Sequence, residues 1–153
     1  VRALRRQIME AYIDENGVEA KAGLLPMLRE LKQMGLRIGL ATATPEARAR
    51  KYLRMVGVED AFDAVACAEM VAHGKPAPDV YLLAAQKLNL PPEELLGVED
   101  SPSGVQSAHA AGMTVAMVPD QDQPSAEIAA LCALVAPSLA GIAPFVKESL
   151  RRL

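Results

Sequence analysis

The sequence predicts a three-layer α/β domain, in which helices cover both faces of a parallel sheet. Two observations lead to this fold class. Short apolar runs recur along the chain, and a stretch with helical periodicity separates each run from the next, which is the pattern of βαβ units. The chain has 153 residues, of which 51% are hydrophobic, so it has the length of one ordinary domain and can bury a sizeable core.

The predicted strands are short and mostly apolar, as expected when a parallel sheet is buried on both faces. The last of them is the weakest, because it is the shortest. They lie at residues 37–41, 64–67, 95–99, 114–118 and 133–135.

The helices are marked mainly by their ends. Leucines recur at helical spacing in residues 24–31, up to Gly35, a residue type that commonly follows the end of a helix. Thr44 and Pro45 are typical of an N-cap and a first helical turn, so we expect a second helix from there to near Gly57. Two more helices are predicted to begin near Asp79 and Pro102.

The first residues also carry apolar side chains at helical spacing, which predicts a helix there. The chain opens without methionine and without a helix start signal. We therefore expect it to be a piece of a longer protein, and we divide it into residues 1–22 and an α/β domain at residues 23–153. The apolar positions of the predicted first helix are Val1, Leu4, Ile8 and Ile13.

Composition narrows the range of partners. The net charge of −3 arises from 16 basic and 19 acidic residues without a long run of one sign, which argues against nucleic acid as a partner and favours a small molecule. Cys67 and Cys132 lie far apart in apolar surroundings, as reduced core cysteines of a cytoplasmic protein do. No window approaches about 18 uninterrupted apolar residues, so we expect no membrane segment.

Ligands of such sheets bind beyond the carboxyl ends of the strands, and an acidic pair lies at one of these ends. Glu99 and Asp100 close the predicted strand at 95–99, where they could provide part of the oxygen shell of Mg²⁺. The alternative is that Glu99 is solvated and that Asp100 caps the following helix.

Two other candidates fall on the same edge of the predicted sheet. Thr42 could bind a phosphate oxygen through its hydroxyl, together with the backbone amides that lead into the helix after Pro45, or it could be an ordinary turn residue. Lys75 lies in a loop that Pro76 and Pro78 stiffen, and could neutralise phosphate charge there, or it could be a solvated surface lysine. Together these residues offer a hydroxyl, a cation and a carboxylate pair.

Three segments of the chain resemble the second, third and fourth motifs of the haloacid dehalogenase superfamily, in order and spacing. The likeness spans about residues 23–119 and is closest to the branch with β-phosphoglucomutase and sugar-phosphate phosphatases. The segments are Leu-Ala-Thr-Ala-Thr-Pro at 40–45, Gly-Lys-Pro-Ala-Pro-Asp-Val-Tyr at 74–81 and Gly-Val-Glu-Asp-Ser-Pro-Ser-Gly at 97–104.

The resemblance implies a Rossmann-like core and a role for each matching residue. Thr42 would bind the transferring phosphoryl group with help from the Ala43 amide, and Lys75 would stabilise the charge of nucleophile and phosphate. Asp100 and Glu99 would help to hold Mg²⁺. Residues 1 to about 12 look like the final helix of the cap domain that such enzymes insert after their first strand.

The first motif of the family, an Asp-x-Asp after an N-terminal strand, has no counterpart at the expected place. The Asp-x-Asp of this chain, Asp120-Gln121-Asp122, follows a different strand and has the composition of a surface turn. We therefore expect the core to be incomplete at its N-terminus, with the family's first strand missing between the strands at 37–41 and 95–99. The two strands could pair directly, a second chain could fill the position by self-association, or the sequence could omit residues of the native protein, which we favour.

The resemblance implies an enzyme, of which this chain would be the C-terminal part. It would be a magnesium-dependent phosphatase that hydrolyses a small phosphorylated metabolite, similar to a sugar phosphate, through an aspartyl-phosphate. A phosphosugar mutase of the β-phosphoglucomutase type shares every motif seen here, and a non-catalytic phosphate- and metal-binding module is the third possibility. Without its nucleophile the chain by itself should be inactive.

Overall fold

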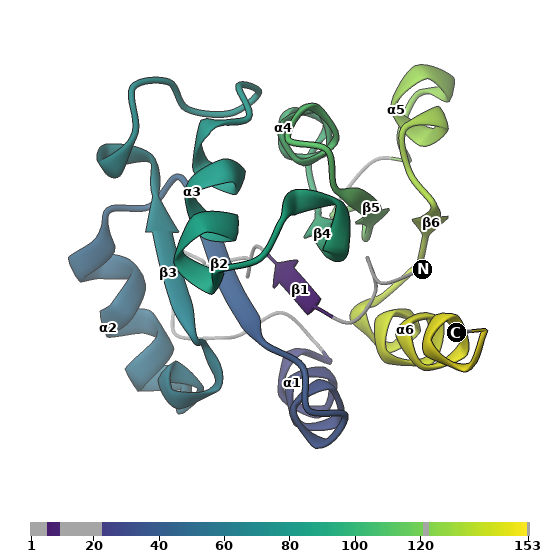
Figure 1. The fold of residues 1–153 in the computed structure, drawn as a ribbon, viewed down its shortest axis with the longest axis horizontal. Helices are drawn as coiled ribbons and strands as arrows, with labels where there is room; N and C mark the ends of the chain where they lie inside the picture. Colours follow the sequence, from purple (N-terminus) through teal and green to yellow (C-terminus); the bar gives the residue numbers. More distant parts are fainter. Residues whose placement is uncertain (1–5, 10–22, 121–122, 153) are drawn as a thin grey trace.

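The protein contains a six-stranded parallel sheet with the strand order β3-β2-β1-β4-β5-β6 (Figure 1). This computed structural model describes residues 6–9, 23–120 and 123–152. All five predicted strands are confirmed, with ends that differ by two residues or fewer. The strands are β1 (Arg6–Met9), β2 (Ile38–Thr42), β3 (Ala64–Cys67), β4 (Leu95–Glu99), β5 (Thr114–Met117) and β6 (Leu134–Val135).

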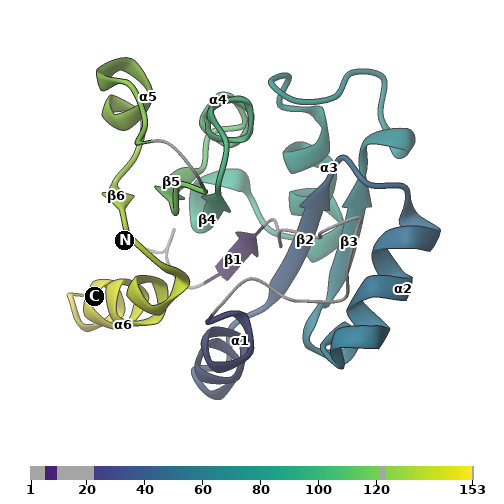
Figure 2. The same ribbon diagram turned by 180° about the vertical axis from the view of Figure 1, so that it is seen from behind.

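Helices cover both faces of the sheet, so the predicted three-layer fold is confirmed. One apolar cluster packs α1, α2 and α6 against one face, and a second cluster packs α3, α4 and α5 against the other. Figure 2 shows the same layers from behind. The helices are α1 (Leu24–Gln33), α2 (Glu46–Val56), α3 (Asp79–Leu88), α4 (Pro102–Ala110), α5 (Ala126–Ala130) and α6 (Ile142–Arg151), with short 3₁₀ helices η2 (Glu59–Ala61), η3 (Ala68–Met70), η4 (Pro92–Glu94) and η5 (Leu139–Gly141).

Strand β4 shows how the sheet divides its side chains between the two layers. Because successive residues of a strand point to opposite faces, Leu96 and Val98 join the cluster under α1 and α6, whereas Leu95 joins the cluster under α3 and α4. Gly97 lies on the side of Leu95, and a Cβ there would be only 2.8 Å from the Cβ of Ala108 in α4. Helix α4 therefore approaches the strand closely, directly below the end at which the acidic pair lies.

The central strand β1 corrects the prediction for the N-terminal residues. Arg6–Met9 does not form a helix but pairs in parallel with β2 on one side and with β4 on the other. The prediction of a helix over these four residues is wrong because it weighed apolar spacing alone, whereas two strands with unpaired backbone groups provide hydrogen bonds on both sides.

Because β1 belongs to the same chain, the position between β2 and β4 is not vacant. Neither direct pairing of these two strands nor a strand from a second chain is needed, and self-association loses the reason for which we considered it. Residues 1–5 and 10–22, the rest of the predicted cap remnant, lie outside the described residues, so the domain boundary at residue 22 stays a prediction.

The helix ends follow the sequence signals with one exception. Gly35, which follows the C-cap residue of α1, and Gly57, the C-cap of α2, have φ angles of 77° and 83°, which are left-handed values that favour glycine. The N-cap of α2, however, is Pro45 and not Thr44. The amide of Thr44 is instead bound by the side chain of Thr42, which holds the turn in a different way. Among the described residues, no helix is both long and apolar enough to cross a membrane.

Candidate active site

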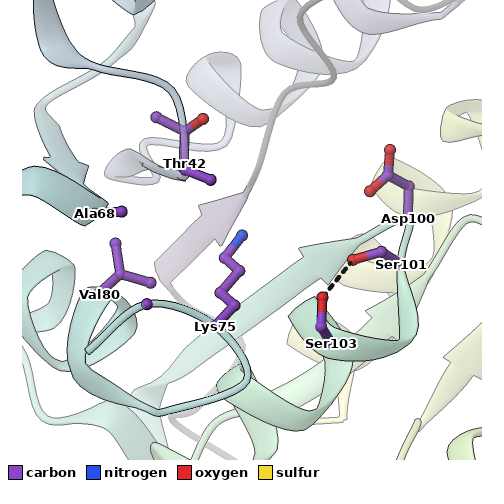
Figure 3. Close-up of a pocket in the computed structure, with 9 residues that line it drawn as sticks. Thr42, Ala68, Lys75, Val80, Asp100, Ser101 and Ser103 are labelled. Carbon is purple, nitrogen blue, oxygen red and sulfur yellow. Dashed lines mark hydrogen bonds between the residues drawn. The ribbon is translucent and has the colours of Figure 1, made fainter.

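A pocket of about 290 Å³ opens at the carboxyl ends of β2 and β4 (Figure 3). It lies where the sequence placed the candidate residues, and four of the five predicted site residues line it. Strand β1 separates β2 from β4, so the two walls of the pocket start about two inter-strand spacings, or roughly 9.5 Å, apart. The lining residues are Thr42, Ala43, Ala68, Gly74, Lys75, Val80, Asp100, Ser101 and Ser103.

Thr42 forms one wall of the pocket as the last residue of β2. Although it lines the pocket, the residue is only 3% exposed, and its Oγ1 accepts a hydrogen bond of 3.1 Å from the amide of Thr44. This bond fixes the hydroxyl oxygen, while the hydroxyl hydrogen can still be donated to a ligand. The side chain therefore suits an anionic oxygen as its partner.

The backbone amides that lead into α2 are mostly engaged within the protein. The Thr44 amide is bound to Thr42, Pro45 has no N–H group, and the amide of Glu46 donates to Oε1 of Glu69 at 2.8 Å. We expected several amides of this turn to bind a phosphate. Of residues 43–46, this leaves the amide of Ala43 as the candidate donor, and Ala43 lines the pocket.

Lys75 is not a solvated surface lysine. Its side chain is 8% exposed, and its Nζ lies 2.6 Å from Oε2 of Glu99 and 3.2 Å from the carbonyl oxygen of Ala41. Figure 3 shows the ammonium group pointing into the space between Thr42 and Asp100. The loop that carries it is tied to α4, because the hydroxyl of Ser107 donates to the carbonyl oxygen of Ala77 at 2.6 Å. The cation is thus held in a fixed position at the pocket wall.

Glu99 and Asp100 are neighbours in sequence but occupy different environments. Glu99 continues the alternation of β4 toward the layer of α3 and α4, where it is 1% exposed and does not line the pocket. Asp100 begins the following turn and lines the pocket. The alternative role of Asp100 as a helix cap does not apply, because Ser101 is the N-cap of α4 and accepts a hydrogen bond of 3.1 Å from the Gly104 amide.

The two carboxylates differ in how well they suit a metal ion that keeps water and phosphate among its ligands. Among residues 23–120 and 123–152, no group of three or more histidine, cysteine, aspartate or glutamate side chains is placed to hold a metal. Mg²⁺ commonly takes only one or two protein carboxylates, with waters and substrate phosphate completing the shell. Asp100 lines the pocket and could contact such an ion directly. Glu99 does not line the pocket, and its unpartnered Oε1 lies against Gly104, so only Asp100 of the pair is placed for this ion.

Two residues at the site escaped the sequence analysis as functional candidates. The hydroxyl of Tyr81 donates to Oε2 of Glu99 at 2.5 Å, and Gly104 leaves room for the Glu99 carboxylate, since a Cβ at residue 104 would be 1.8 Å from Oε1. A fully buried tyrosine and a buried glutamate each need a polar partner, but their burial results from the packing of the fold, so the sequence carried no signal for this pair.

The fold and the pocket define a class of protein: an α/β domain that presents a hydroxyl, an ammonium and a carboxylate at the carboxyl edge of its sheet. The family model described as haloacid dehalogenase-like hydrolase matches residues 1–112. The chain belongs to this family, and the proposed resemblance is confirmed.

Individual relatives agree with this assignment. The chain is 43% identical over 110 residues to protein CbbY of Rhodobacter capsulatus, which covers 66% of this chain and 48% of that protein. It is 39% identical over 121 residues to hexitol phosphatase B of Escherichia coli, covering 75% and 54% of the two chains. The crystal structure of β-phosphoglucomutase from Clostridium difficile aligns with 26% identity and a TM-score of 0.74, over 87% of this chain and 57% of that one. The chain thus spans about half the length of the curated relatives it matches.

Proposed function

We propose that this chain provides the phosphate- and magnesium-binding part of a phosphatase that acts on a small phosphorylated carbohydrate. The observation that carries the proposal is the convergence of Thr42, Lys75 and Asp100 on one pocket. With about 290 Å³, the pocket is at the small end of ligand sites, which run from about 300 to 1,000 Å³. That size suits a phosphoryl group better than a whole sugar phosphate.

Each residue has a distinct role in this proposal. The hydroxyl of Thr42 and the amide of Ala43 bind oxygens of the phosphoryl group, and the ammonium of Lys75 neutralises the charge that is spread over these oxygens during transfer. Asp100, which lines the pocket, would hold Mg²⁺. When bound, the ion would supply further positive charge to the phosphoryl oxygens and orient the group.

The acceptor of the phosphoryl group in this family is an aspartate of the Asp-x-Asp motif, and we propose an aspartyl-phosphate here as well. The four described residues of β1, Arg6–Met9, contain no aspartate. The proposal therefore concerns the protein expressed from its complete coding sequence, which we call the full-length protein. A cytoplasmic location is part of the proposal, because Cys67 and Cys132 are free thiols, as is usual in a reducing compartment.

The test is phosphate release by the full-length protein from a panel of phosphorylated sugars and sugar alcohols, with Mg²⁺ and with a chelator. We expect turnover of at least one of these compounds that the chelator abolishes. Absence of turnover on the whole panel, from a protein that binds neither phosphate nor Mg²⁺, would contradict the proposal.

A phosphosugar mutase is the second candidate, because a β-phosphoglucomutase is among the similar structures. The same panel separates the two, since a mutase returns an isomeric sugar phosphate and a phosphatase returns inorganic phosphate.

The 153-residue chain tests the third possibility, a module that binds without turnover. We expect this chain to show no magnesium-dependent hydrolysis of a generic phosphomonoester, because no described carboxylate other than that of Asp100, which is assigned to the metal, lines the pocket. Robust turnover that Asp122→Asn abolishes would show that the Asp-x-Asp at residues 120–122 provides the nucleophile after all.

A further inference from the structure

Tyr81 is a polar residue at the site that the proposed function leaves without a role. It lies in the first turn of α3 and is fully buried among apolar residues. Its hydroxyl donates to Oε2 of Glu99 at 2.5 Å, and its ring centroid lies 5.2 Å from Nζ of Lys75. A phenylalanine would fill the same space and keep the ring contact, so packing alone does not explain the hydroxyl.

The two oxygens of Glu99 are treated differently. Oε2 accepts hydrogen bonds from both Lys75 and Tyr81, whereas Oε1 has no hydrogen-bond partner among the described residues. Oε1 lies against the backbone of Gly104, where only the missing Cβ leaves it room. The carboxylate is thus held by two hydrogen-bond donors at Oε2 and by close packing against Gly104 at Oε1.

This arrangement connects Tyr81 to the pocket through two direct contacts. Tyr81 binds Glu99, Glu99 binds Lys75, and Lys75 lines the pocket. If Lys75 were the only donor to Oε2, the negative charge of this oxygen would attract the ammonium alone and pull the ammonium away from the pocket. The tyrosine hydroxyl shares that charge and fixes the place of Oε2 between α3 and the loop of Lys75.

We propose that Tyr81 is a positioning residue for the phosphate site, whose hydroxyl acts through Glu99 to hold the ammonium of Lys75 at the pocket. This inference rests on the proposed function, because it takes the pocket to bind phosphate. Tyr81 itself does not line the pocket, and its ring contact with Lys75 would be kept in a phenylalanine, so the effect of its hydroxyl on a ligand passes through the Glu99–Lys75 ion pair.

The experiment is a double-mutant cycle read out by binding of inorganic phosphate to the full-length protein, measured by calorimetry in the presence of Mg²⁺. Tyr81→Phe removes only the hydroxyl, and we expect it to weaken phosphate binding about fivefold. Lys75→Ala should weaken binding more strongly. In the double variant the loss should equal that of Lys75→Ala alone, because the hydroxyl acts only through the ammonium. Tyr52→Phe, the same deletion in α2 and outside the site, is the matched control and should bind like the unmodified protein.

The outcomes separate the two levels of the proposal. If Lys75→Ala binds phosphate normally, the proposed phosphate site fails. If Lys75→Ala weakens binding but Tyr81→Phe does not, or if the two losses add in the double variant, the positioning role alone is overturned and the hydroxyl is only structural. Thermal unfolding identifies a misfolded Tyr81→Phe, in which case Glu99→Gln interrupts the same connection and must weaken phosphate binding for the inference to stand.

Discussion

The ends of strands β4 and β5 carry the same local design but have different surroundings. In both, an acidic residue follows the strand and a serine caps the next helix: Ser101 accepts from the amide of Gly104 at 3.1 Å, and Ser125 accepts from the amide of Ile128 at 3.3 Å. A pocket lies at each end, of about 290 Å³ beyond β4 and about 390 Å³ beyond β5. By local sequence alone, either end could be the site.

The neighbouring elements distinguish the two ends as candidate phosphate sites. Beyond β4, the loop after β3 contributes Lys75 and β2 contributes Thr42, whereas the residues that line the pocket beyond β5 include Asp100 and Asp120 but no lysine, arginine or histidine. The register pairs Glu99 with Met117, so β5 has an apolar residue where β4 has the partner of Lys75. A site therefore needs the convergence of several strand ends, and a strand end with an acidic turn is not sufficient.

Loss of the cation should have the largest effect. In the full-length protein, Lys75→Ala should lower turnover about a hundredfold over a wide range of Mg²⁺ concentration, because added metal cannot replace a cation that is fixed on the phosphate. The free energy of unfolding should also fall by about 3–5 kcal/mol, since Glu99 would remain buried without its charged partner. Kinetics at several Mg²⁺ concentrations and chemical denaturation measure the two effects.

Lys87→Ala is the matched control for this prediction. Lys87 donates to the carbonyl oxygen of Val65 and does not line the phosphate pocket, so its loss should cost only about 0.5–1.5 kcal/mol and leave turnover unchanged. Equal kinetics for Lys75→Ala and the unmodified protein would remove the main connection between this pocket and phosphoryl transfer.

A side chain at residue 104 should disturb the contact between Glu99 and Lys75, which the β4 end has and the β5 end lacks. Gly104→Ala would place a Cβ 1.8 Å from Oε1 of Glu99, so the carboxylate must shift away from Lys75. We expect a loss of about 1–3 kcal/mol in unfolding free energy, as for overpacking of a core, together with weaker phosphate binding. Gln106→Ala, on the exposed face of the same helix, should change neither quantity. Unchanged stability of Gly104→Ala would mean that Glu99 is not held as tightly as its contacts indicate.

The two acidic turns can be compared directly by neutralising each of them. Asp100→Asn should raise the Mg²⁺ concentration required for half-maximal activity by about tenfold, because a charged oxygen ligand becomes a neutral one while the shape is kept. Asp120→Asn changes an exposed residue of the other turn and should have no such effect. The test is to measure the activity of both variants as a function of Mg²⁺ concentration. An equal rise in the half-maximal concentration for the two variants would contradict the proposed difference between the strand ends.

Thr42→Val should have the smallest effect of the four. It removes one hydroxyl from the pocket and also leaves the amide of Thr44 without its acceptor, but the amide of Ala43 and the ammonium of Lys75 remain. We expect the KM for substrate to rise about fivefold, with a smaller change in kcat. A loss as large as that of Lys75→Ala would show that the hydroxyl contributes more to the transition state than a neutral hydrogen bond does.

Most of the fold was predictable because its strands are apolar runs with clear breaks between them. Strand β1 was not, since the four residues Arg6–Met9 carry no pattern that separates a strand from a helix, and their partners lie far away in sequence. Pairing on both sides decided the matter, and such pairing is a property of the assembled sheet.

The site was predictable as far as it depends on strand ends. Thr42, Lys75 and Asp100 converge as expected, because the carboxyl ends of parallel strands share one edge. The roles of these residues stay predictions. The sequence did not distinguish Glu99 from Asp100, and it did not show that Tyr81 and Gly104 hold the buried carboxylate, because those contacts arise only when α3 and α4 pack on the sheet.

The central place of β1 also has a consequence for the order in which the protein assembles. Strand β1 is the first described strand to leave the ribosome, and it can pair with β2 early. Its other edge stays unpaired until β4 has been synthesised, because Arg6 pairs with Leu95. Among the described strands, β1 alone joins the β2–β3 half of the sheet to the β4–β5–β6 half, so these halves cannot form one sheet until that distant pairing is made. The pocket spans the same junction, so phosphate binding should be among the last properties that the folding chain acquires.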